Sequence, residues 1–172
     1  MTARLVGPVA FLALVAVGFL MFGASDSTGN KQLTPAETIA PYATNVAIPN
    51  IQITDAAGKE TWLNKLRGPI LITLWSGECP ECKEGLKDIE TFVKGNTQFK
   101  VMLVNHLQNP ETANAVLKKN SVTLPTYFDH NGDAFRALSA TMPASYYIIE
   151  GRIRYFFPGR ISTEHLQALL TQ

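Results

Sequence analysis

Two apolar runs near the middle of the chain predict the centre of a sheet. Residues 69–75 (P-I-L-I-T-L-W) are almost continuously apolar, and so are residues 101–104. Runs of this kind are typical of strands that are buried on both faces. Between them, apolar side chains recur at helical spacing from Leu86 to Phe92, so we expect an amphipathic helix over residues 80–93.

The rest of the chain alternates short strand and helix patterns. Strand patterns cover residues 51–54, 124–128, 145–150 and 152–157, and helical patterns cover residues 62–66, 110–119, 135–138 and 163–170. Turn residues follow the first of these strands, at 55–58, and a small hairpin is expected there. The order of elements predicts an α/β domain with helices on both faces of the sheet.

The N-terminal segment has the composition of a membrane anchor. Residues 5–24 carry no charge, and Arg4 precedes them. About 20 helical residues match the hydrocarbon core of a bilayer, which is about 30 Å thick. A cleaved signal peptide is the alternative, although Gly23-Ala24-Ser25 is a weak cleavage site. The positive charge predicts a cytoplasmic N-terminus. We therefore expect a single-pass protein of the bacterial inner membrane, with its domain facing the periplasm or the cell exterior.

Three segments follow from these patterns. Residues 1–24 form the anchor or signal segment, residues 25–47 a polar linker, and residues 48–172 one folded domain. A content of 46% hydrophobic and 17% charged residues is enough to build a core. The net charge of +1 and the lack of a basic stripe give no reason to expect a nucleic-acid partner.

The two cysteines of the chain, Cys79 and Cys82, stand in a C-P-E-C motif. A disulfide across two residues closes a very short loop and constrains the unfolded chain little. A zinc site needs about two further ligands, and the three histidines of the chain are scattered. Redox chemistry is therefore the leading interpretation, with no metal and no cofactor expected. A metal-binding chaperone or binding module that uses the same pair is the alternative.

The predicted position of Cys79 suits a nucleophile. It lies between a buried strand and the start of a helix, where free N–H groups and the helix dipole favour an anionic thiolate. Cys82, one helical turn further on, can attack the mixed disulfide and release the partner. The acidic residues Glu78 and Glu81 oppose thiolate formation. They make the reduced form less favoured, which predicts a reductase of partner disulfides rather than a strong oxidant.

The stretch L-W-S-G-E-C-P-E-C-K resembles the active-site segment of the TlpA/ResA/CcmG-like thioredoxin family. The order of later motifs agrees, including L-P-T-Y-F-D before Asn131-Gly132 and T-M-P-A before S-Y-Y-I-I-E-G-R-I. The resemblance covers about residues 48–170. It implies a thioredoxin-like three-layer α/β/α sandwich with an N-terminal β-hairpin extension, and the activity of an extracytoplasmic thiol–disulfide oxidoreductase.

The resemblance also implies partners. A protein disulfide is the expected substrate, with apocytochrome c as the family's usual one in cytochrome c maturation. A membrane thiol donor such as a CcdA/DsbD-type protein would then restore the dithiol, since no thiol pool is expected outside the cytoplasm.

Several further site residues come from the resemblance. Pro143 corresponds to the family's cis-proline, which faces the two cysteines, and the backbone of Met142 would pair with a substrate strand. Trp75, four residues before Cys79, forms either part of the core or a wall of the site.

The sequence departs from the pattern at two positions. Glu78 stands where the family often has Trp. Thr73 stands where thioredoxins proper carry a buried Asp, and a hydroxyl cannot replace that base. Glu81 is the first candidate for a proton carrier and Glu78 the second, the alternative for Glu81 being a solvated charge at the helix start.

Overall fold

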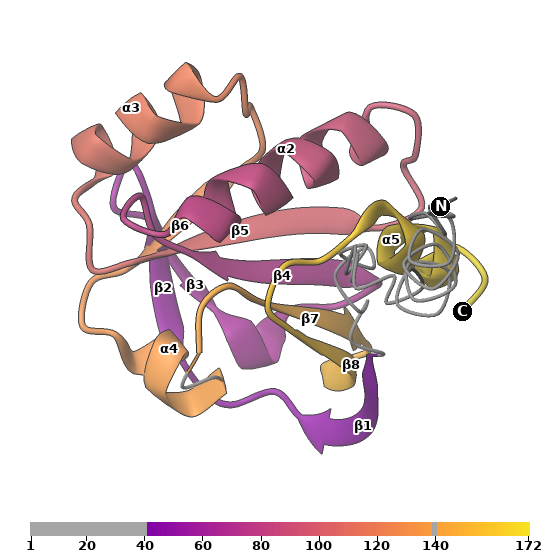
Figure 1. Ribbon diagram of the computed structural model, residues 1–172. Helices are drawn as coiled ribbons and strands as arrows, with labels where there is room; N and C mark the ends of the chain where they lie inside the picture. The colour runs from indigo at the N-terminus through magenta and orange to yellow at the C-terminus, as the bar shows by residue number, and fades with distance from the viewer. Residues whose placement is uncertain (1–40, 139–140) are drawn as a thin grey trace, which may run out of the picture. The chain divides into compact units, whose positions relative to one another are not determined.

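The computed structural model describes residues 41–138 and 141–172, which form one mixed sheet with helices on both faces (Figure 1). The sheet order is β1-β8-β7-β4-β5-β6-β2-β3. The strands are β1 (Tyr42–Ala47), β2 (Gln52–Asp55), β3 (Glu60–Trp62), β4 (Ile70–Trp75), β5 (Lys100–His106), β6 (Thr126–Asp129), β7 (Ala144–Ile149) and β8 (Arg152–Pro158). Strands β4, β5 and β6 are parallel, and the other pairings are antiparallel.

Four α-helices and one short 3-10 helix complete the described chain. They are α2 (Pro80–Val93), α3 (Pro110–Lys119), α4 (Asp133–Leu138), α5 (Thr163–Leu169) and the 3-10 helix η1 (Leu63–Lys65). Both α2 and α3 begin with proline, which has no N–H to leave unpaired in the first turn. The Asn109 side chain caps α3 by accepting a hydrogen bond of 2.8 Å from Thr112 N.

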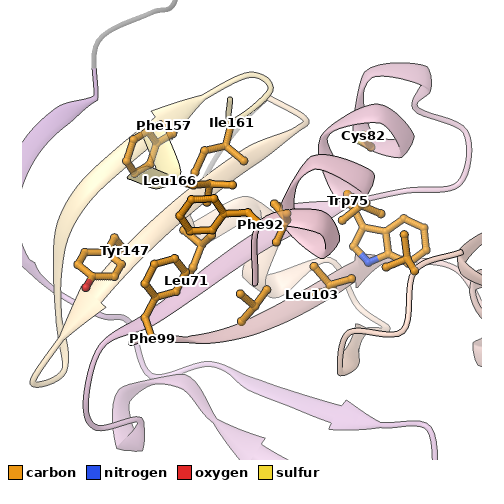
Figure 2. Packing of buried hydrophobic residues seen from close by; sticks show 14 of the residues in the cluster. Leu71, Trp75, Cys82, Phe92, Phe99, Leu103, Tyr147, Phe157, Ile161 and Leu166 are labelled. Atoms are coloured by element: carbon orange, nitrogen blue, oxygen red, sulfur yellow. The ribbon is translucent and has the colours of Figure 1, made fainter. Parts of the chain in front are cut away.

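Alternate residues of β4 face opposite sides of the sheet, and all of them are buried. Leu71 and Trp75 belong to a hydrophobic cluster with residues of α2, α3 and α5 (Figure 2). Ile70, Ile72 and Leu74 belong to a second cluster with η1 and α4. Figure 1 shows α2 and α3 on one side of the sheet and α4 on the other. The end of β4 is therefore a rigid support for the chain that leaves it.

The sheet register brings three segments together at that end. Trp75 is paired with Asn105 of the parallel strand β5. Leu74 is paired with Ala144, the first residue of the antiparallel strand β7. The turn after β4, the loop after β5 and the Pro143 segment before β7 thus lie along one edge of the sheet.

Most of the predicted elements are present. The helices predicted over 80–93 and 110–119 have these bounds, and the strands predicted over 145–150 and 152–157 are β7 and β8. The turn between them carries Glu150 and Gly151 at φ 51° and 72°, the geometry of a tight hairpin. Residues 52–55, one position after the strand predicted over 51–54, and residues 60–62 form the antiparallel pair β2 and β3.

The linker predicted over residues 25–47 is wrong at its C-terminal end. Residues 42–47 form β1, which pairs antiparallel with β8 at the edge of the sheet. Five of its six residues are exposed, so the strand leaves no apolar alternation in the sequence. The anchor predicted over residues 1–24 lies outside the described residues. Within residues 41–138 and 141–172, no helix has the length and apolar content to span a membrane.

Candidate active site

Cys79 and Cys82 are joined by a disulfide at the N-terminus of α2, with their Cα atoms 5.2 Å apart. Cys79 is the residue that caps the helix. Its backbone is extended, its N–H donates to Ser76 O at 3.2 Å, and its sulfur accepts from Cys82 N at 3.1 Å. The predicted strand-to-helix junction is therefore present. A backbone donor directed at the Cys79 sulfur stabilises a thiolate there when the bond is reduced.

The two cysteines differ in exposure. Cys79 is partly exposed, whereas Cys82 is 2% exposed and belongs to the cluster between α2 and the sheet (Figure 2). An external disulfide can therefore reach the Cys79 sulfur directly, and the Cys82 sulfur only after rearrangement.

The two glutamates predicted near the cysteines are both exposed to solvent. Glu78 lies in the turn before Cys79 and donates its N–H to Ser76 Oγ at 3.2 Å. Glu81 lies in the first turn of α2. Exposure is compatible with proton exchange with water, and equally with the solvated charge that the sequence left open as an alternative for Glu81.

A cation that the sequence analysis did not single out pairs with the next acidic residues of α2. Arg160 Nη1 lies 2.6 Å from Glu84 Oε2, and Nη2 lies 2.6 Å from Asp88 Oδ2. Hydrogen bonding to Asp88 raises the pKa of the Arg160 guanidinium above its ordinary value, and the negative charges of Asp88, Glu84 and Glu81 act in the same direction. The acidic face of α2 therefore carries a fixed counter-charge.

The Met142–Pro143 peptide bond is cis, as the resemblance implies. Pro143 is buried, and Met142 is partly buried against the same hydrophobic cluster as Cys79. The Pro143 carbonyl accepts a hydrogen bond of 2.9 Å from Gly159 N. The segment before β7 is thus tied to the loop that carries Arg160.

Trp75 and Thr73 occupy the face of β4 that is covered by α2. Trp75 is fully buried, and no described residue bonds to its indole Nε1, which favours the core interpretation over a wall of the site. The Thr73 hydroxyl lies 2.9 Å from the hydroxyl of Ser145 on β7, and both residues are buried. A neutral hydroxyl pair therefore occupies the position where the resemblance implies a carboxylate in thioredoxins.

The turn that leads to Cys79 is supported from the side by β5. Gly77 N donates to Gln108 Oε1 at 2.7 Å, and the same oxygen accepts from Asn105 Nδ2 at 2.9 Å. Gln108 N in turn donates to Asn105 Oδ1 at 3.2 Å. This amide network joins the cysteine turn to the end of the neighbouring strand.

A family model for the AhpC/TSA family matches residues 44–157. The chain belongs to the AhpC/TSA family. The match begins within β1 and ends within β8, so it contains both cysteines, the cis-proline and the amide network.

Individual relatives of this AhpC/TSA-family chain carry thiol–disulfide names. Sporulation thiol-disulfide oxidoreductase A of Bacillus subtilis is 27% identical over 104 residues, 56% of this chain and 63% of the relative. This chain thus spans about 63% of that relative's length. The crystal structure of StoA from Bacillus subtilis has a TM-score of 0.61 and 23% identity, covering 72% of this chain and 98% of that one. A DsbE from Chlorobium tepidum, described as a putative thiol:disulfide interchange protein, has a TM-score of 0.61 and 18% identity, covering 77% and 98%.

These likenesses bear on two of the predictions. The thioredoxin-like α/β fold of this AhpC/TSA-family member is confirmed. The resemblance to thioredoxin-like thiol–disulfide oxidoreductases is also confirmed, because StoA and DsbE are among its similar proteins.

Four residues around the site of this AhpC/TSA-family chain were not among the predicted site residues. Gly77, Asn105, Gln108 and Arg160 all bond to the turn, to α2 or to each other. Gly77, in the turn next to the motif, was the available signal, because a glycine before a catalytic turn often marks a close approach of another group.

Proposed function

We propose that this protein is an extracytoplasmic thiol–disulfide oxidoreductase that reduces disulfides of partner proteins through Cys79 and Cys82. The observation that carries the proposal is the disulfide between a partly exposed Cys79 at a helix N-terminus and a buried Cys82. That arrangement separates an attacking thiol from a resolving thiol.

The cycle starts from the dithiol form. The Cys79 thiolate attacks one sulfur of the partner disulfide, which forms a mixed disulfide and releases the other partner sulfur as a thiolate. The Cys82 thiolate then attacks the Cys79 sulfur and releases the second partner thiolate. Two electrons and two protons pass from the domain to the partner, and the domain is left with the Cys79–Cys82 disulfide. A membrane dithiol of the CcdA/DsbD type supplies two electrons and two protons to restore it.

Other residues have supporting roles in this proposal. Glu81, exposed in the first turn of α2, is the proposed acceptor of the Cys82 proton, with Glu78 as the second candidate. Met142 and Pro143 contact the partner segment beside Cys79, which agrees with their position along the same edge of the sheet. The buried Trp75 supports the turn from below rather than contacting the partner.

The location and the partner belong to the same proposal. An anchor over residues 1–24 would hold the domain outside the cytoplasmic membrane, as the uncharged segment predicts. Apocytochrome c is the proposed substrate, supported by the family that the C-P-E-C segment resembles.

The test is reduction of insulin by the full chain in detergent, with Cys79→Ser and Cys82→Ser as a matched pair. Wild-type protein is expected to reduce insulin, and both variants are expected to lose turnover. Only Cys82→Ser should accumulate a mixed disulfide, because it keeps the attacking thiol and lacks the resolving one. Full activity of Cys79→Ser contradicts the proposal.

The direction of electron flow is tested separately. The Cys79–Cys82 couple is equilibrated with a thiol redox buffer, and its state is read by alkylation. A potential at or below about −230 mV is expected for a reductase, whereas a value near about −120 mV belongs to an oxidant.

A further inference from the structure

Gln108 is the central residue of the amide network beside the cysteine turn. Its Oε1 accepts two hydrogen bonds, from Gly77 N at 2.7 Å and from Asn105 Nδ2 at 2.9 Å. Asn105 is fully buried and closes the ring by accepting from Gln108 N at 3.2 Å. Asn105 and Gln108 hold each other in place, so Gln108 Oε1, which accepts from Gly77 N, has a defined position.

The backbone between Asn105 and Gln108 has a conformation that permits the contact between Gln108 and Gly77. Leu107 adopts φ 60°, a left-handed conformation that is uncommon for leucine. It turns the chain back after β5, so that Gln108 reaches the turn after β4. A conformation of this kind persists where the surrounding contacts determine it. Here the surrounding contacts are the side-chain ring and the hydrogen bond of 3.2 Å from Leu107 N to Asp129 O.

Gly77 shows how closely the turn approaches its support. A Cβ atom at Gly77 would lie 2.9 Å from Gln108 Nε2 and 3.0 Å from Val116 Cγ2 of α3. Gly77 is buried, so its N–H has no solvent to replace Gln108 as acceptor. The turn is therefore held between β5, α3 and the start of α2.

We infer that Gln108 is a positioning residue that fixes the turn before Cys79 and thereby sets the stability of the Cys79 thiolate. The inference rests on the proposed function and deepens it. Gly77 lies two residues before Cys79, whose sulfur accepts from Cys82 N at 3.1 Å. Keeping this donor on the sulfur requires a fixed turn. A neutral amide accepts from Gly77 without adding a negative charge beside a sulfur that must ionise.

The experiment uses the full chain and two isosteric charge substitutions. Gln108→Glu keeps the accepting oxygen and adds a carboxylate near Cys79. Gln167→Glu adds the same charge on the exposed surface of α5 and is the control. The readouts are the pH dependence of Cys79 alkylation in the reduced protein and the equilibrium with a thiol redox buffer near pH 8.

Gln108→Glu is expected to raise the apparent pKa of the Cys79 thiol and to lower its alkylation rate near neutral pH about threefold. Its equilibrium with the thiol buffer should move toward the disulfide by a similar factor, because the reduced thiolate is destabilised. Gln167→Glu should leave both readouts unchanged. Unchanged alkylation and equilibrium in Gln108→Glu would overturn the inference.

A second variant separates positioning from charge. Gln108→Leu removes the acceptor for Gly77 N, so the turn loosens and the alkylation profile of Cys79 should again shift. A role limited to fold stability would lower the midpoint of unfolding equally in the oxidised and reduced states, and would leave the redox equilibrium at its wild-type value. That result would contradict the inference. Insulin reduction by the wild type tests the proposed function, and its result does not depend on either Gln108 variant.

Discussion

Arg160 holds Asp88 through two hydrogen bonds to the same carboxylate oxygen, from Nη2 at 2.6 Å and from Nε at 3.1 Å. A third bond, of 2.6 Å, joins its Nη1 to Glu84. The preceding residue, Gly159, donates its N–H to the carbonyl of the cis-proline Pro143. One short loop thus connects the helix that carries the cysteines with the segment that faces a partner in the proposed cycle.

Replacing Arg160 with glutamine should lower the free energy of unfolding by about 0.5–1 kcal/mol, the range of a partly exposed ion pair with good geometry. The loss should shrink in about 1 M NaCl, because salt screens the pair. Urea unfolding at low and high salt measures both effects. Arg136→Gln, which removes an exposed pair with Asp133 within one helix, is the control and should cost less than about 0.5 kcal/mol. An equal, salt-independent loss in both variants would contradict the interpretation.

Glu90 should contribute stability that disappears in acid. Burial raises the pKa of this carboxyl, but hydrogen bonds from Thr123 N and Oγ1 and the charge of Lys94 lower it by more, and the net pKa lies below the ordinary value of 4.5. Its stabilising effect is therefore fully present above about pH 4.5 and is lost as the pH falls through the lowered folded-state pKa.

Glu90→Gln is expected to cost about 1–3 kcal/mol near neutral pH, because the neutral amide loses the charge-assisted hydrogen bonds from Thr123 N and Oγ1 and the ion pair with Lys94. The difference from the wild type should shrink as the pH falls below about 4.5. Urea unfolding across the acid range measures it. Glu111→Gln, at an exposed position of α3, should follow the wild-type profile. A pH-independent difference at Glu90 would show that its charge is not the cause.

Two glycines near the site should respond to alanine in opposite ways. Gly77→Ala brings a Cβ to 2.9 Å from Gln108 Nε2 and 3.0 Å from Val116 Cγ2, and overpacking of this kind costs about 1–3 kcal/mol. Gly85→Ala, inside α2, meets only Arg160 Cγ at 3.4 Å and should gain about 0.5–1 kcal/mol from helix propensity. Thermal unfolding of the two variants tests the pair. A stable Gly77→Ala would mean that the turn does not need the close approach.

The buried hydroxyls of Thr73 and Ser145 should behave as a coupled pair. Thr73→Val removes the partner that Ser145 has in the structure and is expected to cost about 1–3 kcal/mol. Removing both hydroxyls, in Thr73→Val with Ser145→Ala, should restore part of that loss. A double-mutant cycle in urea gives the coupling energy, and strictly additive losses would contradict the pairing.

The local elements of this fold could be predicted because their signals are local. The buried strand β4 and the helix α2 are specified by apolar side chains within their own residues. Strand β1 could not be predicted in the same way. Its stability comes from pairing with β8, more than a hundred residues further along the chain, and its exposed side chains carry no periodicity.

The candidate site divides in the same manner. The C-x-x-C spacing of Cys79 and Cys82 indicates redox chemistry, so the sequence alone predicts this pair. Gln108 lies 31 residues from its partner Gly77, and Arg160 lies 72 residues from Asp88. Glutamine and arginine are common in loops, and only the parallel register of β4 and β5 or the return of the chain after β8 gives these residues a role.

The difference in exposure between the two cysteine sulfurs also limits occupancy. Cys79 borders solvent, whereas Cys82 is enclosed by the cluster beneath α2. A protein attached to Cys79 occupies the exposed sulfur of the pair, and Cys82 is the thiol already beneath it. Each domain can therefore hold one covalent partner at a time. The thiol of a second protein does not compete with Cys82 for the Cys79 sulfur of the mixed disulfide. This stoichiometry follows from packing and does not depend on the reduction potential.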